Sequence, residues 1–422
     1  MKNILFLSIL FTTFYITAQE PTYDAVRKNE IVSNKLENSK ETLNKPYVIM
    51  VSLDGFRFDY AKRYNAKNIL NMAKNGSSAT RLIPSFPSKT FPNHYSIATG
   101  LYPEHHGIIS NSFYNKETGT RYSIGNREAV QNGDWYGGIP LWNLAQLQGM
   151  CSASYYWVGS EADVNGMHPK YYYPYNKQTP YEYRIKRVLE WLQLPENVRP
   201  HIITLYFSLI DTNGHKYGPN SEETKQAVQY VDKQIGVLRN GLKKLNLPVY
   251  LVVTSDHGMD EVSHLINIHD YVNVNNQQFF AGPVAMIYTK DEAETDSLFN
   301  KLTQQTNFKT YKRAHVPNYL NYNDNPKIGD LVLITDPPNT IINSQSDKTE
   351  LKQLEGTHGY DPFENKNMGA IFYIEGPDIK KDYKLSPIEN VNIYPLIAHL
   401  LQLTINEPID GKFDAMSSVI KE

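Results

Sequence analysis

Residues 84–111 read PSFPSKTFPNHYSIATGLYPEHHGIISN, and the fold and the chemistry of the chain can be worked out from this stretch. The prolines predict an irregular polar loop, followed by a short helix that begins at Thr90 and a turn that ends at Asn111. A threonine at the start of a helix exposes its hydroxyl beside free backbone N–H groups, where anions bind. Thr90 is therefore a candidate nucleophile toward a phosphate. An ordinary N-cap is the more common role of a lone threonine, so the rest of the chain decides.

Acidic side chains follow buried strands elsewhere in the chain. Residues 46–54, PYVIMVSLD, predict a buried parallel strand that ends at Asp54. Residues 201–210, HIITLYFSLI, predict another such strand, and Asp211 comes directly after it. Ligands of open α/β sheets bind beyond the carboxyl ends of the strands. Both carboxylates are thus candidates for a functional site, although a strand-end aspartate can also cap a helix.

Histidines accompany these carboxylates. The D-x-x-x-H spacing of Asp211 and His215 lets a carboxylate and an imidazole reach one ion, although the spacing alone is common. Residues 248–254, PVYLVVT, predict a strand that leads into Asp256 and His257. Neighbours in a strand point to opposite faces, and the glycine that follows permits the turn that would bring both side chains to one ion.

These side chains form two predicted metal sites. Zinc prefers histidine nitrogen and carboxylate oxygen, and catalytic zinc sites keep one position open. One predicted set is Asp211, His215 and His358. The other set is Asp54, Asp256, His257 and the Thr90 oxygen. Two ions roughly 4 Å apart can clamp both oxygens of a displacement at phosphorus, and coordination makes a hydroxyl nucleophilic. We therefore expect two zinc ions per chain; the alternative for each histidine is a satisfied residue of the core.

The first 19 residues, MKNILFLSILFTTFYITAQ, resemble a secretory signal peptide, with Lys2 before an apolar run and small or polar residues after it. The run is short for a membrane span, so an uncleaved anchor is the less favoured alternative. We expect an exported protein, periplasmic or secreted, with no stable membrane span in the mature form. Cys151 is the only cysteine, which excludes an intramolecular disulfide.

Composition indicates a globular α/β protein. The chain of 422 residues is 41% apolar and carries a formal net charge of -2, so no basic excess suggests binding of duplex nucleic acid. Its length suits one large domain or two medium ones. We expect an N-terminal tether or peripheral helix at 20–45, a catalytic domain at 46–422 and a peripheral insertion at about 280–350. Helices are expected at 57–75, 221–245 and 388–401.

Several short motifs follow one another along the chain: Thr90-Phe91-Pro92-Asn93-His94, Thr99-Gly100-Leu101-Tyr102-Pro103, His106-Gly107-Ile108, Asp256-His257-Gly258-Met259 and Thr357-His358-Gly359. In order and spacing they closely resemble the nucleotide pyrophosphatase/phosphodiesterase family of the alkaline phosphatase superfamily, in a compact bacterial type. The resemblance extends from about residue 46 to 413. It implies an alkaline-phosphatase-like α/β core, with a mostly parallel central sheet flanked by helices.

The resemblance also implies roles for the candidate residues. Thr90 would attack the phosphorus and hold a covalent nucleotidyl intermediate, with one zinc activating it. The second zinc would orient the leaving group and later the hydrolytic water. Asn111 matches the residue that donates to a non-bridging phosphate oxygen, although a turn-forming asparagine is the alternative.

Substrate residues follow from the same resemblance. Phe91 and Tyr175 match the residues that sandwich the base in members that cleave nucleotides, with plain packing as the alternative. Lys89, Trp157 and Glu161 match positions of further nucleotide contacts, and Glu161 departs from the usual aspartate.

The implied function is an exported two-zinc hydrolase that converts a nucleoside triphosphate, as a small-molecule substrate, into a monophosphate and pyrophosphate. A lysophospholipid or choline-type phosphodiesterase on the same site is one alternative. A non-catalytic binding protein on the same fold is another. That alternative predicts a missing ligand or a missing Thr90, and none is missing.

Overall fold

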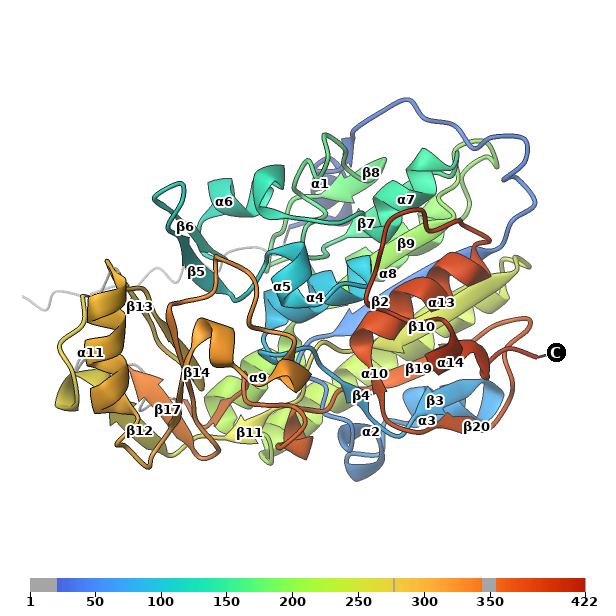
Figure 1. Cartoon of the computed structure of the whole chain (residues 1–422). Coiled ribbons are helices and arrows are strands. Elements are labelled where there is room, and N and C mark those ends of the chain that lie inside the picture. The colour runs from blue at the N-terminus through green and yellow to red at the C-terminus, as the bar shows by residue number, and fades with distance from the viewer. Residues whose placement is uncertain (1–20, 276–277, 344–353, 422) are drawn as a thin grey trace, which may run out of the picture.

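The computed structural model describes residues 21–275, 278–343 and 354–421, and the predicted signal peptide at 1–19 lies outside them. Within the described part, the largest sheet has nine strands, in the order β1-β8-β7-β9-β2-β10-β19-β3-β20 (Figure 1). Their bounds in that order are Ile31–Val32, Tyr171–Tyr173, Ser152–Tyr155, Ile202–Phe207, Tyr47–Leu53, Val249–Thr254, Phe372–Glu375, Ser77–Ala79 and Tyr383–Leu385. The five strands β8, β7, β9, β2 and β10 run parallel to one another, and β19 is antiparallel to both of its neighbours, β10 and β3. The predicted α/β class with a mostly parallel central sheet is confirmed.

Helices cover both faces of this sheet because its central strands are apolar on both sides. Along β2, Ile49 and Val51 belong to one core cluster and Val48 and Met50 to the other. The helices packed on the first face are α2 (Tyr60–Arg63), α3 (Lys67–Asn75), α8 (Tyr181–Trp191) and α10 (Glu222–Lys243). Those on the second face are α4 (Thr90–Thr99), α7 (Leu141–Leu147) and α13 (Ile393–Leu400).

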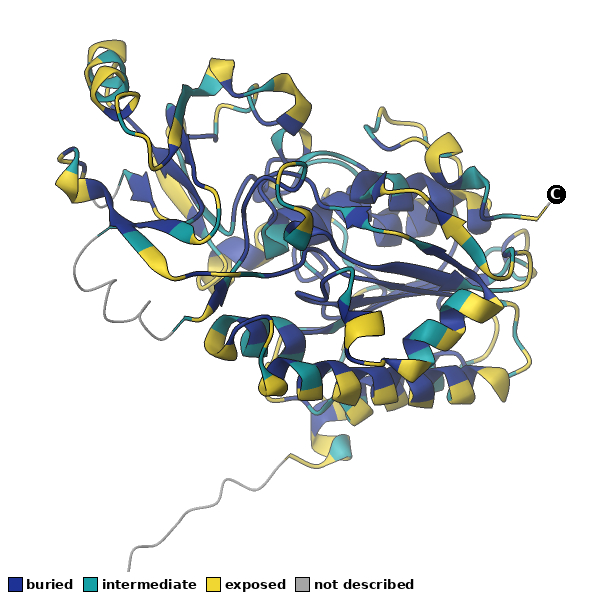
Figure 2. Cartoon of the chain, turned by 90° about the horizontal axis from the view of Figure 1, so that it is seen from below, coloured by how far each residue is buried: buried dark blue, intermediate teal, exposed yellow. Residues whose placement is uncertain are grey.

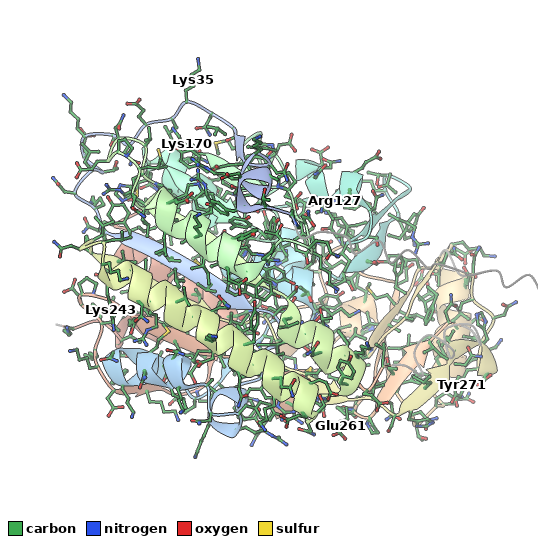
Figure 3. All side chains as sticks on the ribbon, turned by 180° about the vertical axis from the view of Figure 1, so that it is seen from behind. Lys35, Arg127, Lys170, Lys243, Glu261 and Tyr271 are labelled. Atoms are coloured by element: carbon green, nitrogen blue, oxygen red, sulfur yellow. The ribbon has the colours of Figure 1, made fainter. Side chains whose placement is uncertain are left out.

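The long helix α10 illustrates how the outer layer forms. It begins where the Ser221 side chain accepts a hydrogen bond from the Thr224 amide, close to the predicted boundary. Figure 3 shows it lying along the sheet and ending near Lys243. Figure 2 shows that the helices turn buried residues toward the sheet and exposed residues outward.

The N-terminal segment, where we expect a tether or a peripheral helix, is described from residue 21 onward. This segment contains the short helix α1 (Tyr23–Arg27) and contributes β1 to the edge of the main sheet, paired antiparallel with β8. The Asn38 side chain is buried and bonds to backbone groups of three distant residues. The segment is therefore part of the fold, because its polar side chains find partners that lie far away in the sequence.

Three predicted elements have different bounds. The helix expected at 57–75 is two helices, α2 and α3, separated where Asn65 adopts a left-handed conformation with φ of 55°. The helix expected at 388–401 begins only at Ile393, because Ile388–Glu389 forms β21 beside β4 (Leu82–Ile83). The strand expected at 201–210 ends at Phe207, and helix α9 (Leu209–Tyr217) begins almost at once.

The region predicted as an insertion forms a second, smaller sheet beside the main one (Figure 1). It is antiparallel, in the order β13 (Phe279–Phe280), β14 (Val284–Ile287), β16 (Leu331–Ile334) and β15 (Lys309–Lys312), and α11 (Glu292–Leu302) packs on it. Strand β12 (His264–Asn267) pairs with β17 (Asn339–Ile342) nearby.

The other α-helices and strands in the described residues are short. They are α5 (Pro103–His106), β5 (Ser112–Asn115), β6 (Thr120–Ser123), α6 (Arg127–Gln131), β11 (Asp260–Glu261), β18 (Gly356–Thr357) and α14 (Asp414–Ser417). None of the helices in the described ranges combines the length and the apolar character that crossing a membrane requires.

Candidate active site

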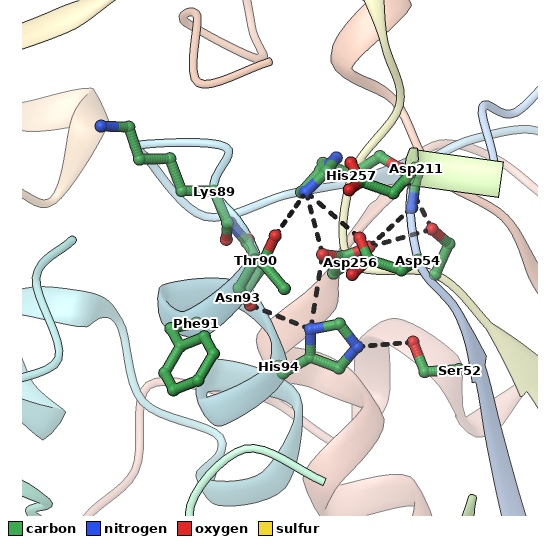
Figure 4. A network of polar contacts seen from close by, with 12 residues as sticks. Ser52, Asp54, Lys89, Thr90, Phe91, Asn93, His94, Asp211, Asp256 and His257 are labelled. Carbon is green, nitrogen blue, oxygen red and sulfur yellow. Dashed lines mark hydrogen bonds and ion pairs between the residues drawn. The ribbon is translucent and has the colours of Figure 1, made fainter. Parts of the chain in front are cut away.

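The candidate site lies at the carboxyl ends of three adjacent parallel strands. Asp54 follows β2, Asp211 follows β9, and Asp256 and His257 follow β10. Because parallel strands end at the same edge of the sheet, these side chains meet although the sequence separates them widely. Figure 4 shows them gathered beside Thr90.

Thr90 is the first residue of α4, as predicted from the sequence, and the extended Lys89 precedes it. Its hydroxyl oxygen lies 3.2 Å from Nε2 of His257. The backbone N–H of Phe91, in the first turn of the helix, donates to Oδ1 of Asn111 over 3.0 Å. The nucleophile candidate thus stands at a helix N-terminus and directly contacts one of the two acid–histidine groups.

The first group consists of Asp54, Asp256 and His257, all buried. Nε2 of His257 lies 3.0 Å from Oδ2 of Asp256 and 3.6 Å from Oδ1 of Asp54. The other oxygen of Asp54 accepts a hydrogen bond from the hydroxyl of Tyr206. One oxygen of each carboxylate is therefore held near the histidine nitrogen that also faces Thr90.

The second group consists of Asp211, His215 and His358. Helix α9 places Asp211 and His215 four residues apart on one face, with Asp211 Oδ1 3.3 Å from Nε2 of His215. Nε2 of His358 lies 3.6 Å from the same oxygen. The rings of His257 and His358 stack with centroids 3.5 Å apart, so the two groups adjoin.

The histidines of both groups are oriented in the same way. Nδ1 of His215 lies 2.9 Å from the Gly356 carbonyl oxygen. Nδ1 of His257 lies 2.8 Å from the carbonyl oxygen of Gly258, and Nδ1 of His358 lies 2.9 Å from the carbonyl oxygen of Ser88. A carbonyl only accepts, so Nδ1 carries a proton in each ring and Nε2 is the nitrogen that faces the carboxylates.

Three carboxylate oxygens of the site are buried and have no hydrogen-bond partner among the residues that the structure describes. They are Oδ1 of Asp54, Oδ1 of Asp211 and Oδ2 of Asp256, the same oxygens that lie nearest to the histidine Nε2 atoms. In each group, ligand atoms lie within 4.8 Å of one another. Buried acceptors that converge in this way fit a bound cation, and backbone contacts at Nδ1 are typical of metal-binding histidines.

The pKa values show how concentrated the negative charge is. Burial raises the pKa of Asp54, and the carboxylates of Asp256 and Asp211 raise it further. Although burial raises it, the neighbouring His215 lowers the pKa of Asp211 to about 2. Although burial lowers it, Asp211 raises the pKa of His215 to about 9. A divalent cation between the carboxylates would offset the same charge.

A cavity of about 230 Å³ opens beside Thr90, Asp54 and Asp211. Four of the predicted substrate residues line it: Phe91, Tyr175, Trp157 and Glu161. The Tyr175 side chain is 37% exposed. The structure thus places these four residues around the same cavity as Thr90.

The individual contacts refine these positions. The indole N–H of Trp157 donates to the carbonyl of His94 over 2.9 Å, so Trp157 offers the cavity its ring rather than a hydrogen bond. Glu161 is paired with Arg127. Lys89 does not line the cavity; its Nζ lies 3.3 Å from Ser110 Oγ, and burial lowers its pKa to about 8.

Two residues of the site were not singled out by the sequence patterns. Tyr206, whose hydroxyl holds Asp54, stands within a predicted buried strand, where a tyrosine is unremarkable without knowledge of its partner. Arg127, which lines the cavity and pairs with Glu161, lies 34 residues before it and belongs to no recognisable motif. Only the folded chain shows their relation to the site.

The chain matches a family profile and is similar to several known proteins. The profile described as "Type I phosphodiesterase / nucleotide pyrophosphatase" matches residues 48–361. Venom phosphodiesterase 2 of Crotalus adamanteus is 36% identical over 389 residues, which are 89% of this chain and 47% of that protein. Ectonucleotide pyrophosphatase/phosphodiesterase family member 1 of Homo sapiens is 36% identical over 392 residues, 89% of this chain and 42% of that protein. The chain spans about half the length of the curated relatives it matches.

Solved structures with a similar fold come from the same group of proteins. An inactive variant of murine ectonucleotide pyrophosphatase/phosphodiesterase 5, in complex with AMP, matches with a TM-score of 0.83 and 29% identity, over 89% of this chain and 100% of that chain. The motifs, the fold and the extent of these matches are consistent with one another. The chain therefore belongs to the type I phosphodiesterase/nucleotide pyrophosphatase family.

Proposed function

We propose that this protein is a metal-dependent nucleotide pyrophosphatase/phosphodiesterase that uses two zinc ions and a threonine nucleophile. The observation that carries the proposal is the arrangement around Thr90. Two adjoining acid–histidine groups present three unpartnered buried oxygens, and one of these groups contacts the Thr90 hydroxyl. Such a constellation suits in-line displacement at phosphorus.

The residues present fit two metal ions. The ligands of one ion would be Asp54, Asp256, His257 and Thr90. The ligands of the other would be Asp211, His215 and His358. Bound there, zinc would make the threonine hydroxyl more acidic and offset the negative charge of the phosphate. Zinc is the favoured metal because both sets mix histidine nitrogen with carboxylate oxygen.

The reaction proceeds in two displacements. Thr90 Oγ1 attacks the α-phosphorus of a nucleoside triphosphate, the bond to pyrophosphate breaks, and a threonyl-nucleotidyl ester forms. Water then cleaves this ester, releasing the nucleoside monophosphate and restoring the hydroxyl.

Asn111 would support both displacements from its position beside the first turn of α4. The Phe91 N–H occupies its amide oxygen, so its NH₂ group remains to donate to a non-bridging phosphate oxygen. Donors aimed at a phosphate stabilise the charge that develops in the transition state.

The side chains that line the cavity support a nucleotide substrate over a lysophospholipid or choline-type diester. Phe91 and Tyr175 offer aromatic surfaces for a base, and Glu161 with Arg127 offers polar groups at the same cavity. A structural relative has been solved with AMP bound. We assign Lys89 no contact in this pose, because it lies outside the cavity residues.

We also infer that the protein is exported. Residues 1–19 have the pattern of a signal peptide, and relatives are named as venom and ecto-enzymes. The catalytic domain of the mature protein would then comprise residues 46–422 together with the N-terminal segment that supplies β1.

The test is to incubate zinc-loaded protein with ATP and separate the products by chromatography, with Thr90→Ala protein in parallel. AMP plus pyrophosphate from the wild type alone supports the proposal. ADP plus phosphate would overturn the substrate pose. Release of phosphocholine from a lysophospholipid, with no reaction on ATP, would replace the nucleotide by a phospholipid-type substrate. Absence of any turnover in protein that holds two zinc ions would favour a binding protein on this fold.

A further inference from the structure

His94 lies one helical turn after Thr90 on α4 and is fully buried beside the first acid–histidine group (Figure 4). Its Nδ1 atom lies 2.9 Å from the carbonyl oxygen of Thr90 and 3.4 Å from Oδ2 of Asp256. Both oxygens only accept, so Nδ1 carries the ring proton. On the other side of the ring, Nε2 lies 2.8 Å from the hydroxyl oxygen of Ser52. One imidazole thus touches the backbone of the nucleophile, a candidate metal ligand and strand β2.

The carboxylate of Asp256 is fixed asymmetrically. Its Oδ1 accepts hydrogen bonds from the Gly55 amide over 3.1 Å and the Ser255 hydroxyl over 3.2 Å. Its Oδ2 is buried, has no hydrogen-bond partner and lies 3.0 Å from Nε2 of His257. The His94 N–H is therefore the polar group that faces the free oxygen of Asp256 from the side of α4.

We propose that His94 is a positioning residue that fixes the position of Thr90 relative to the free oxygen of Asp256. The Ser52 hydroxyl holds the imidazole ring of His94 in place. The proposal rests on the proposed function, since it concerns the same metal site. Without the Nδ1 donor, α4 would lose its side-chain contact with Asp256 and would keep only the contact of Thr90 with His257 to the segment that follows β10. Outer groups of this kind orient metal ligands and commonly change affinity about 10- to 100-fold when removed.

A matched control exists in the same part of the fold. His106 is also fully buried and also contacts a serine, with Nε2 3.0 Å from Ser96 Oγ. Its Nδ1 accepts from the Ile108 amide over 3.2 Å. His106 belongs to neither acid–histidine group. Substitutions at His106 therefore report the cost of losing a buried histidine–serine contact without touching the site.

The experiment compares asparagine and glutamine at both histidines. The amide of His94→Asn can place a donor near the Nδ1 position, whereas that of His94→Gln reaches toward Nε2 and Ser52. Zinc dissociation constants are measured by chelator competition, together with the melting temperature and with kcat and KM for ATP.

We expect His94→Gln to weaken one zinc site by about 10- to 100-fold and to lower kcat more than KM changes. His94→Asn should remain much closer to the wild type in both quantities. His106→Asn and His106→Gln should lower the melting temperature and leave zinc affinity unchanged.

Equal losses in the two His94 variants, or the same zinc effect at His106, would show that His94 only fills space and would overturn the proposal. If His94→Gln does not fold, Ser52→Ala carries the test, with weakened zinc binding expected and unchanged zinc binding contradicting the proposal. Failure of the proposed function is separate, because wild-type protein that binds zinc without cleaving ATP still allows the zinc comparison.

Discussion

In the proposed mechanism Thr90 contributes one oxygen atom, and that atom lies 3.2 Å from Nε2 of His257. We predict that Thr90→Ala abolishes ATP cleavage and leaves the fold and the zinc content close to those of the wild type. The reason is that the six acidic and histidine ligands remain when the hydroxyl is removed. Activity and zinc content are measured on the same preparation. Substantial activity at normal zinc content would exclude the covalent mechanism.

Tyr175 lines the cavity beside Thr90, and we propose that it binds the base of the substrate and takes no part in the reaction at phosphorus. Stacking on an aromatic side chain is worth roughly 1–3 kcal/mol per base, which corresponds to about a 5- to 150-fold change in affinity. We therefore predict that Tyr175→Ala raises KM for ATP by a factor in this range, with a smaller effect on kcat.

Two comparisons make this prediction specific. A small nitrophenyl phosphodiester has no base to stack, so its kinetics should change little in Tyr175→Ala. Tyr230, 38% exposed on α10, is a matched surface tyrosine, and Tyr230→Ala should behave as the wild type. An equal loss on both substrates would contradict base stacking at Tyr175.

At the scale of elements, the segment before β2 offers the clearest test. The Nδ2 group of Asn38 donates to the carbonyls of Glu196 over 2.7 Å and Arg199 over 2.8 Å, and its Oδ1 accepts from the Cys151 amide over 2.7 Å. Asn38→Ala would leave these backbone groups without partners. We predict a loss of roughly 2–4 kcal/mol in the free energy of unfolding, measured by urea denaturation.

The neighbouring Glu37 provides the control, because it is exposed. Glu37→Ala should change the free energy of unfolding by less than about 0.5 kcal/mol. If Asn38→Ala changed the free energy of unfolding as little as Glu37→Ala, the N-terminal segment would add nothing to the stability of the domain and would act as a tether.

At the scale of the whole molecule, we expect the proposed metal binding to be coupled to folding. The two ligand sets join residues from position 54 to position 358, so a cation bound to the folded chain links distant parts of it. We predict that a chelator lowers the melting temperature and that zinc restores it. Free zinc at a thousand times its dissociation constant would add about 4 kcal/mol per site. A melting temperature that does not change when zinc is removed would contradict two-site binding.

The sequence determined which groups are available and the local structure around most of them. Buried strands before Asp54 and Asp256 and a helix that starts at Thr90 follow from apolar runs and the rules of helix ends, whereas the mostly parallel sheet is what the family resemblance implies. The motifs also sufficed to identify the family. These features are local, or they recur in a constant order, so they can be recognised without knowing which residues touch.

The tertiary structure decided which side chains meet. Thr90 and His257 are 167 residues apart, and their contact depends on the order of the strands in the sheet. The same holds for the pairing of Arg127 with Glu161 and for the position of Lys89 outside the cavity. It also holds for His94, whose place in a motif says nothing of Ser52 or Asp256. Propensity and periodicity act over a few residues, whereas these contacts arise only when the two faces of the sheet are packed.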